Sequence, residues 1–206
     1  RTIRQYKDKD IPKKELEKIL EVMRYAPSGH NAQPCEYIII KDRELIKMIS
    51  DITIQSFKSF RNVMRIRKLL KPFVPKPFYE ILDSRSTALG IEDMMKRYAS
   101  GEDVIFFDAP AVILVHVPDM GALSYVDPAI AATHGMLAAH ALGIGSCWMG
   151  FAMMAAAKHK RLFKVLHIQK GRLIAGIFTL GYPKNKFQRL PVRNPVKTTW
   201  SIGDAN

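Results

Sequence analysis

Apolar residues recur at helical spacing in several stretches of the chain. Residues 12–25 carry them at i, i+3, i+4 and i+7, which predicts an amphipathic helix with one face on the core. Further helices are predicted over residues 42–50, 54–70 and 91–98, and from about residue 155, where the sequence reads AAAKHKRLFKVLHI. The three prolines of KPFVPKPF are expected to end the helix over 54–70, because proline lacks the amide hydrogen that a helix interior requires.

Continuous apolar runs with many β-branched residues indicate three strands. They read CEYIII, APAVILVHVPD and RLIAGIFTLGYP, at residues 35–40, 109–119 and 172–183, and are typical of strands buried inside a domain. Residues 54–107 have a mixed pattern, which we interpret as a variable helical segment able to cover a pocket. The aromatic residues of that segment fit either a substrate site or ordinary core packing.

The sequence DPAIAATHGMLAAHALGIGSCWMG, residues 127–150, predicts a central helix. Asp127 is a good capping residue, and Gly143 is placed to end the helix in a left-handed conformation. The many alanines between them allow other backbone segments to approach the helix closely on more than one face. A compact turn with Gly145 and Ser146 is then expected. Taken alone, this stretch describes a core helix with a glycine cap.

Length and composition indicate an ordinary globular protein. A chain of 206 residues favours a single domain, 1–206, that is large enough to fold without a disulfide or metal staple. Its two cysteines lie far apart and its six histidines include no i, i+4 pair, so no metal site is predicted. This cysteine usage suits a reducing, cytoplasmic compartment. No apolar run reaches the length of a membrane span, so no membrane partner is expected.

The net charge of +13 makes nucleic acid the first partner to consider. The basic residues are spread along the chain, however, and no nucleic-acid-binding motif accompanies them. Their one local concentration, between residues 61 and 71, is most simply a solvated basic helix face. We therefore expect no nucleic-acid partner. A basic surface also attracts acidic proteins and phosphorylated cofactors.

Two polar stretches stand out against the apolar pattern. Arg1, Thr2 and Arg4 place two guanidinium groups and a hydroxyl within four residues, a set that suits a phosphate. APSGHNAQP, residues 26–34, crowds four polar side chains between prolines just before the first predicted strand. Such a loop either presents its side chains to a ligand or uses them for its own turns. Its residue types leave both interpretations open.

Together these pieces resemble the nitroreductase family of FMN-dependent oxidoreductases. The matching stretches are RTIR at the start, APSGHNAQP, ALGIGSCWMGF after the central helix, the strand ending LGYP, and an Arg-x-Pro near the C-terminus. They touch nearly the whole chain except about 54–107. The resemblance implies an α+β three-layer sandwich, with a mostly antiparallel sheet and helices on both faces. It also implies an intertwined homodimer with FMN at the interface, the central helix along that interface and the C-terminal arm around the partner.

The resemblance further assigns residues to the FMN site. The family's basic-basic-Ser-x-basic motif is matched from its second position by Arg1, with Thr2 for the Ser and Arg4 as the last basic residue. Because the chain starts inside this motif, we expect an N-terminal segment upstream of residue 1 to be missing. Arg1, Thr2 and Arg193 are expected at the phosphate. Arg4 is expected beside the pyrimidine side of the flavin, where a cation stabilises the charge of the reduced ring.

The other assigned residues come from the polar loop and the glycine turn. The family's Pro-Ser-x-x-Asn loop, which belongs to the other subunit, is matched by Pro27, Ser28, Gly29 and Asn31, with Gln33 close by. Gly145 and Ser146 match the turn over the flavin ring, and the adjacent Cys147 is expected to pack rather than react. Asn194 stands where many members have Lys, which weakens the expected phosphate contact of the C-terminal arm.

The implied activity is the transfer of two electrons from NADH or NADPH, through FMN, to a nitroaromatic, quinone or similar small acceptor by a ping-pong mechanism. No side chain stands out as an obligate acid, base or nucleophile, as expected where the cofactor carries the chemistry. Two alternatives remain. A ferredoxin-like donor or a fused upstream domain could supply the electrons to a ferredoxin-linked flavin reductase. The protein could also bind FMN without turnover.

Overall fold

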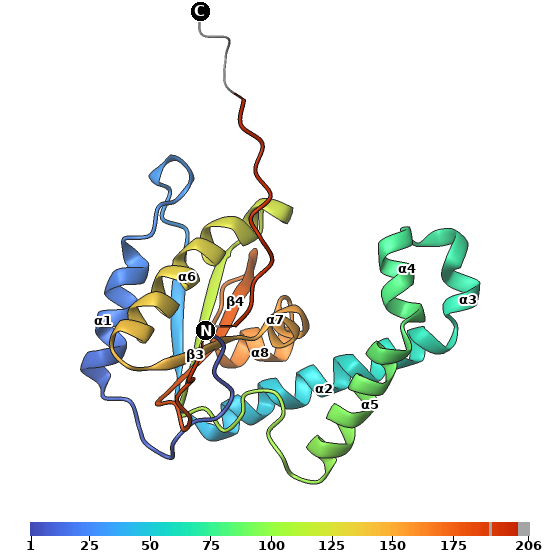
Figure 1. Cartoon of the computed structure of the whole chain (residues 1–206), viewed down its shortest axis with the longest axis horizontal. Coiled ribbons are helices and arrows are strands. Elements are labelled where there is room, and N and C mark those ends of the chain that lie inside the picture. The colour runs from blue at the N-terminus through green and yellow to red at the C-terminus, as the bar shows by residue number, and fades with distance from the viewer. Residues whose placement is uncertain (190, 202–206) are drawn as a thin grey trace, which may run out of the picture.

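The protein is built around a four-stranded sheet (Figure 1), and the computed structural model describes residues 1–189 and 191–201. The strands are β1 (Glu36–Ile40), β2 (Ala111–Pro118), β3 (Gly145–Trp148) and β4 (Arg172–Gly181), in the order β1-β2-β4-β3. All three strand pairs are antiparallel. The central strands β2 and β4 are buried along almost their whole length, because helices cover both faces of the sheet.

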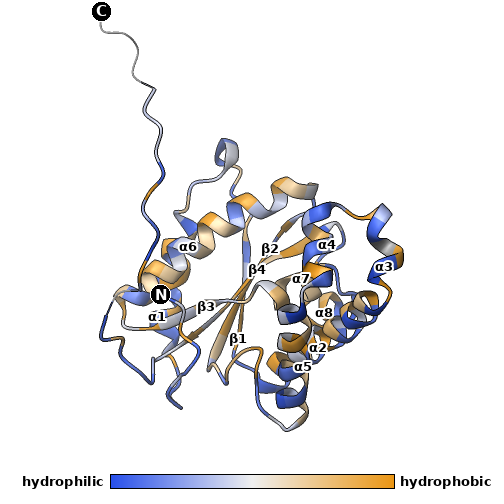
Figure 2. Cartoon of the chain, turned by 45° about the vertical axis from the view of Figure 1, so that its right-hand side comes forward, coloured by the Kyte–Doolittle hydropathy of each residue, from blue (hydrophilic) through white to orange (hydrophobic). Residues whose placement is uncertain are grey.

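The helices form a layer on each side of the sheet (Figures 1 and 2). One face carries α1 (Lys13–Arg24) and α6 (Val126–Ala141), and the other carries α2 (Arg43–Arg65), α7 (Gly150–Ala156) and α8 (Lys160–Val165). Successive strand residues point to opposite faces, so Ile113 joins the α1–α6 core while its neighbour Leu114 joins the other. The predicted α+β sandwich, with a mostly antiparallel sheet between two helical layers, is confirmed.

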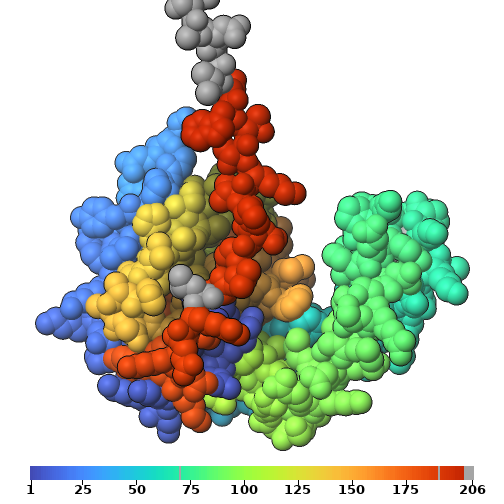
Figure 3. All heavy atoms as spheres, in the orientation of Figure 1, coloured from blue at the N-terminus to red at the C-terminus, as the bar shows by residue number. Residues whose placement is uncertain are grey.

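A helical arm extends away from the second face (Figures 1 and 3). It contains the end of α2, then α3 (Arg67–Leu70), the 3-10 turn η2 (Lys71–Phe73), α4 (Lys76–Asp83) and α5 (Arg85–Ala99). The prediction of separate helices over 42–50 and 54–70 is wrong, because α2 runs without a break to Arg65. The intervening residues contain neither Gly nor Pro, and Asp42 caps the single helix by accepting from the Glu44 amide at 2.8 Å.

Three other local predictions need correction. The helix expected from residue 155 is two helices, separated near His159, whose ring caps α8 by accepting from the Leu162 amide at 3.4 Å. The compact turn expected at Gly145 and Ser146 is the edge strand β3. Asp127 does not cap α6, which begins one residue earlier; its carboxylate instead accepts from the Gly29 amide at 3.4 Å. Gly143 ends the helix at φ +73°, as predicted.

The chain beyond β4 leaves the body of the protein. Its described residues up to 201 form no further helix or strand and run outward past α6 (Figure 3). Within the described ranges, no helix is both long enough and apolar enough to cross a membrane.

Candidate functional site

The N-terminal segment lies against β3. Thr2 forms a parallel bridge with Ser146, and the Ile3 amide donates to the Ser146 carbonyl at 2.9 Å. This pairing brings five of the predicted site residues into one group, which we call the N-terminal cluster: Arg1, Thr2, Arg4, Gly145 and Ser146. Their sequence positions differ by more than 140, so only the fold unites them.

Two glycines make this close approach possible. A Cβ built on Gly145 would lie 2.6 Å from Cγ1 of Ile3, and one on Gly181 would overlap the Tyr6 ring. Side chains at these positions would therefore push the segment off the sheet. Beyond the bridge, Tyr6 pairs with Pro183, which closes the segment against the end of β4.

Tyr6 anchors the segment through its hydroxyl group. It donates to the Ile3 carbonyl at 2.7 Å and lies 2.6 Å from Oγ1 of Thr179 on β4. Burial raises the Tyr6 pKa well above its ordinary value, and the hydrogen bond to Thr179 opposes this only in part, so the phenol stays neutral. Sequence reasoning missed both residues, because no motif links positions 173 residues apart.

The cluster carries positive charge without carboxylate partners. Within the described residues, neither Arg1 nor Arg4 forms an ion pair with Asp or Glu. Arg1 donates to the carbonyl of Arg189 at 2.8 Å and stacks 3.5 Å above the Phe187 ring. The Arg4 guanidinium lies 5.8 Å from the ring centre of Phe107. Two cations without counter-ions beside an edge strand are suited to an anionic ligand such as a phosphate ester.

Cys147 follows the cluster on β3 and is only 2% exposed. Burial raises the pKa of its thiol, and the nearby Arg4 pulls that pKa the other way to a smaller extent. A neutral, enclosed thiol is a poor nucleophile. This agrees with the expectation that Cys147 packs rather than reacts.

The polar loop, residues 26–34, forms a second group. Ser28 Oγ accepts from the Gln33 amide at 2.9 Å, and Gln33 Nε2 donates to Asn31 Oδ1 at 3.2 Å. His30, Asn31 and Gln33 all have φ between +48° and +55°, a region that non-glycine residues rarely adopt. Such backbone strain persists where the surrounding structure maintains it, which is common at binding sites. The loop thus uses some of its polar groups for its own turns and leaves Asn31 and Gln33 exposed.

The loop and the N-terminal cluster lie at opposite ends of the sheet. Ser146 is aligned through Leu180 with Ala111 of β2, whereas Glu36, just after the loop, is aligned with His116. At about 3.3 Å per residue and about 4.8 Å per strand, Ser146 and Glu36 are about 22 Å apart. Helix α6, with 16 residues at about 1.5 Å each, bridges a similar distance of about 24 Å between the two groups. The predicted site residues therefore do not meet within one chain.

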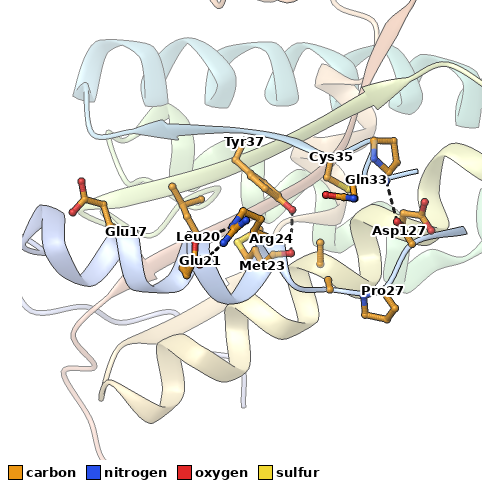
Figure 4. A pocket seen from close by; sticks show the side chains of 14 residues that line it. Glu17, Leu20, Glu21, Met23, Arg24, Pro27, Gln33, Cys35, Tyr37 and Asp127 are labelled. Atoms are coloured by element: carbon orange, nitrogen blue, oxygen red, sulfur yellow. Dashed lines mark hydrogen bonds and ion pairs between the residues drawn. The ribbon is translucent and has the colours of Figure 1, made fainter. Parts of the chain in front are cut away.

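A cavity of about 490 Å³ lies beneath the loop, between α1, β1 and the start of α6 (Figure 4). None of the N-terminal cluster lines it. Burial raises the pKa of Cys35 to about 11, and burial also raises that of Tyr37 to about 12, so both of these lining residues stay neutral. Figure 4 shows side chains of α1 and β1 facing one another across the cavity, with Asp127 at one end.

Arg193 belongs to neither group. It lies exposed in the C-terminal segment. Among the described residues, no three His, Cys, Asp or Glu side chains are placed to hold a metal ion.

The fold and this cationic, carboxylate-free cluster define an α+β protein of the nitroreductase type, and comparisons agree. The nitroreductase family model matches residues 1–182. A candidate NADH dehydrogenase/NAD(P)H nitroreductase of Archaeoglobus fulgidus is 28% identical over 189 residues, which cover 90% of this chain and 82% of its relative. The chain belongs to the nitroreductase family, and with it to the FMN-dependent oxidoreductases that its sequence predicted.

Solved structures show the same fold. A nitroreductase with bound FMN from Desulfitobacterium hafniense matches with a TM-score of 0.68 at 19% identity, covering 96% of this chain and 93% of that one. A nitroreductase with bound FMN from Bacteroides fragilis matches with a TM-score of 0.65 at 20% identity, covering 98% and 94%. At these identities the likeness establishes the architecture.

Proposed function

We propose that the protein binds FMN across a homodimer, with the N-terminal cluster of one chain and the polar loop of the other on the same cofactor. The observation that carries this proposal is the separation of the two groups within one chain, since the strand register places Ser146 and Glu36 about 22 Å apart. A two-fold interface could place each cluster beside the partner's loop. Two equivalent sites would result.

Each group has side chains suited to a different part of FMN. Arg1 and Thr2, joined by Arg193 of a C-terminal arm, would hold the phosphate through charge-assisted hydrogen bonds. Arg4 would hold a positive charge where negative charge develops on the reduced ring. Gly145 and Ser146 would present a flat backbone edge to the ring. The chemistry supplied by bound FMN is the acceptance of two electrons and their delivery to an acceptor.

The polar loop would contact the edges of the flavin ring and the ribityl chain through side chains that both donate and accept hydrogen bonds. Asn31 and Gln33 carry amides with this capacity, and both are exposed. Pro27, Ser28 and Gly29 would set the loop's shape.

The dimer interface that we propose runs along α6. This helix also carries apolar side chains on its solvent-facing side. Val126 is 53% exposed and Leu137 is 64% exposed, on a face that also carries Ala129. The C-terminal arm has exposed apolar side chains as well, including Val192 and Trp200. Uncovered apolar surface of this extent suits a permanent subunit contact.

We further propose NADH or NADPH as the donor and a nitroaromatic, quinone or similar small molecule as the acceptor, both using the same face of the flavin in turn. The single domain, 1–206, would work in the cytoplasm, consistent with two free cysteines. Residues 54–107 would cover the site. Phe73 on the arm is 82% exposed and Phe151 on α7 is 61% exposed, so both are available to contact an aromatic substrate.

One observation favours a protein as the electron donor instead of NADH or NADPH. Residues 54–90 of the arm contain eight Lys or Arg but only two Asp or Glu. This surface would attract an acidic, ferredoxin-like donor protein or fused domain in place of a nicotinamide. A chain that binds FMN but accepts electrons from no donor would instead be a non-catalytic FMN-binding protein.

The first test is reconstitution with FMN, followed by anaerobic reduction with NADH, NADPH and reduced ferredoxin in parallel. Bleaching of the flavin spectrum identifies the donor, and a protein that takes up no FMN refutes the proposal. A mixed dimer tests the shared site. One chain would carry Arg1→Ala and Arg4→Ala, and the other Asn31→Ala. If the site is shared, one of the two sites regains both intact halves, so about half of the FMN capacity returns. If each chain forms its own site, none returns.

A further inference from the structure

A partly buried ion-pair cluster lies where the polar loop joins the sheet. Arg172, the first residue of β4, has a side chain only 13% exposed. Its Nε donates to Nδ1 of His116 at 2.8 Å, and its Nη2 donates to the carbonyls of His116 and Pro34 at 3.1 and 3.2 Å. Its Nη1 lies 2.9 Å from Oε1 of Glu36. The guanidinium thus connects the end of the loop with two neighbouring strands.

The strand register explains why these side chains meet. Glu36 on β1 stands opposite His116 on β2, and Arg172 on β4 stands opposite Pro118, two residues further along. Directly opposite and diagonal neighbours share one face of a sheet. The β2–β4 register also shifts between Val115 and His116, and such bulges redirect nearby side chains.

We propose that Arg172 is a positioning residue for the FMN site, which fixes the polar loop in its binding conformation, and that His116 makes this fixation sensitive to pH. The inference rests on the proposed FMN function. The loop needs an external support because it contains three left-handed non-glycine residues. The last residue of the loop, Pro34, has no amide hydrogen, so the carbonyl of Pro34 is its only backbone group that can form a hydrogen bond.

The contact requires a neutral imidazole. Nδ1 of His116 accepts from Arg172, so a proton on that nitrogen would break the bond and set two cationic groups against each other. The charged groups that face the His116 imidazole are Glu36 and Arg172, and the titratable Cys35 lies close to Arg172. Glu36 on β1 lies 3.8 Å from Nε2 of His116 and favours protonation, whereas Arg172 disfavours it. Cys35, just before β1, stays neutral because burial raises its pKa to about 11.

The geometry predicts that acid releases the loop. Burial and then Arg172 hold the His116 pKa below its ordinary value, and Glu36 opposes this only in part. The imidazole is therefore neutral near pH 7 and gains its proton only in more acidic solution. Protonation would detach Arg172 from His116 and weaken its hold on Pro34.

Three variants test the proposal at neutral pH. Arg172→Met removes every contact of the guanidinium. Arg172→Lys keeps the positive charge but lacks the several N–H donors of the planar guanidinium group. Arg97→Gln, on α5, is the matched control, because it removes two arginine ion pairs, with Asp93 and Glu102, outside the loop. We expect Arg172→Met to weaken FMN binding about tenfold, which is close to the contribution of one charge-assisted hydrogen bond, and Arg172→Lys to have an intermediate effect. Hydrogen exchange of amides 28–33 should accelerate in Arg172→Met even without FMN.

A fourth variant isolates the pH dependence. His116→Gln retains an acceptor for Arg172 but does not titrate in this range. The FMN dissociation constants of the native chain and His116→Gln should be similar at neutral pH. As the pH falls toward about 5.5, the dissociation constant of the native chain should rise relative to that of His116→Gln. The FMN phosphate also titrates near pH 6, but it does so equally in both proteins, so the ratio removes its effect.

The outcomes separate the two proposals. A native chain that binds no FMN defeats the proposed function, and the loop exchange rates then decide on Arg172 alone. Unchanged exchange and unchanged FMN affinity in a folded Arg172→Met protein would overturn the positioning role. If that variant does not fold, a pH-independent ratio between the native chain and His116→Gln would overturn it instead.

Discussion

The amide nitrogen of Ile3 lies 2.9 Å from the carbonyl oxygen of Ser146, so the start of the chain is hydrogen-bonded to the edge strand that follows α6. This bond sets the positions of the residues on either side of Ile3, Thr2 and Arg4. A change that lifts the segment from β3 should therefore disturb cation placement and stability together.

Gly145→Ala should separate the segment from the strand. The added methyl group would lie 2.6 Å from Cγ1 of Ile3, and overpacking of this kind costs about 1–3 kcal/mol. We expect a lower urea midpoint together with weaker FMN binding. Gly90→Ala is the control, because a methyl group there meets nothing within 4 Å and should leave the helix as stable or slightly more so. The double variant with Ile3→Ala should recover much of the loss, and its failure to do so would contradict the steric explanation.

Arg4→Ala should leave FMN binding weakened but present and make the bound flavin harder to reduce. The reason is the loss of a positive charge near the reduced ring, which is the form that the charge stabilises. The measurement is the midpoint potential of the reconstituted protein, with Arg4→Lys as the charge-preserving control. An unchanged potential in Arg4→Ala would refute the placement of Arg4 beside the flavin.

Leu137→Glu should dissociate the proposed dimer. Leu137 is 64% exposed on the uncovered face of α6, and a carboxylate there would be buried without a partner on association. Light scattering after size exclusion should then give the mass of one chain, together with loss of FMN. Val165→Glu, at a 43% exposed position on α8, should leave the assembly intact. A dimer that survives Leu137→Glu would place the interface elsewhere.

The stability of the protein should fall in mild acid through His116. Its folded pKa is lowered by burial and by Arg172, so the unfolded chain gains this proton first as the pH falls below the ordinary value of 6.5. The unfolding free energy should therefore decrease below about pH 6.5, by at most about 1.4 kcal/mol per pH unit for one proton. Urea titrations at several pH values measure this, and the native chain should lose more than His116→Gln. Parallel losses in both proteins would assign the effect to other groups.

The sequence predicted the buried strands and the family well, because both depend on local patterns. The apolar, β-branched runs at 109–119 and 172–183 predicted buried strands, and they form β2 and β4. The strand β3, Gly145–Trp148, was harder to predict. A strand of four residues with two small ones has little pattern of its own, and its pairing with β4 decides its structure.

Long-range side-chain contacts escaped prediction altogether. The Tyr6–Thr179 bond and the Arg172–His116–Pro34 cluster join residues far apart in sequence, and only the register of the sheet brings them together. The continuous α2 was missed for a different reason. Two helices were expected, over 42–50 and 54–70, but no proline or glycine lies between those ranges to break the helix.

The placement of the N-terminal cluster has a consequence for how the protein is made. Residues 1–6 are synthesised long before their partners, which are Ser146, Thr179, Pro183 and Arg189. The contacts with Thr179, Pro183 and Arg189 cannot form until β4 and the residues after it have been synthesised, and loops of this length close late in folding. A chain whose synthesis is interrupted before β4 would therefore contain every helix of the described residues, but it would lack the contacts of residues 1–6 with β4 and with the chain beyond it.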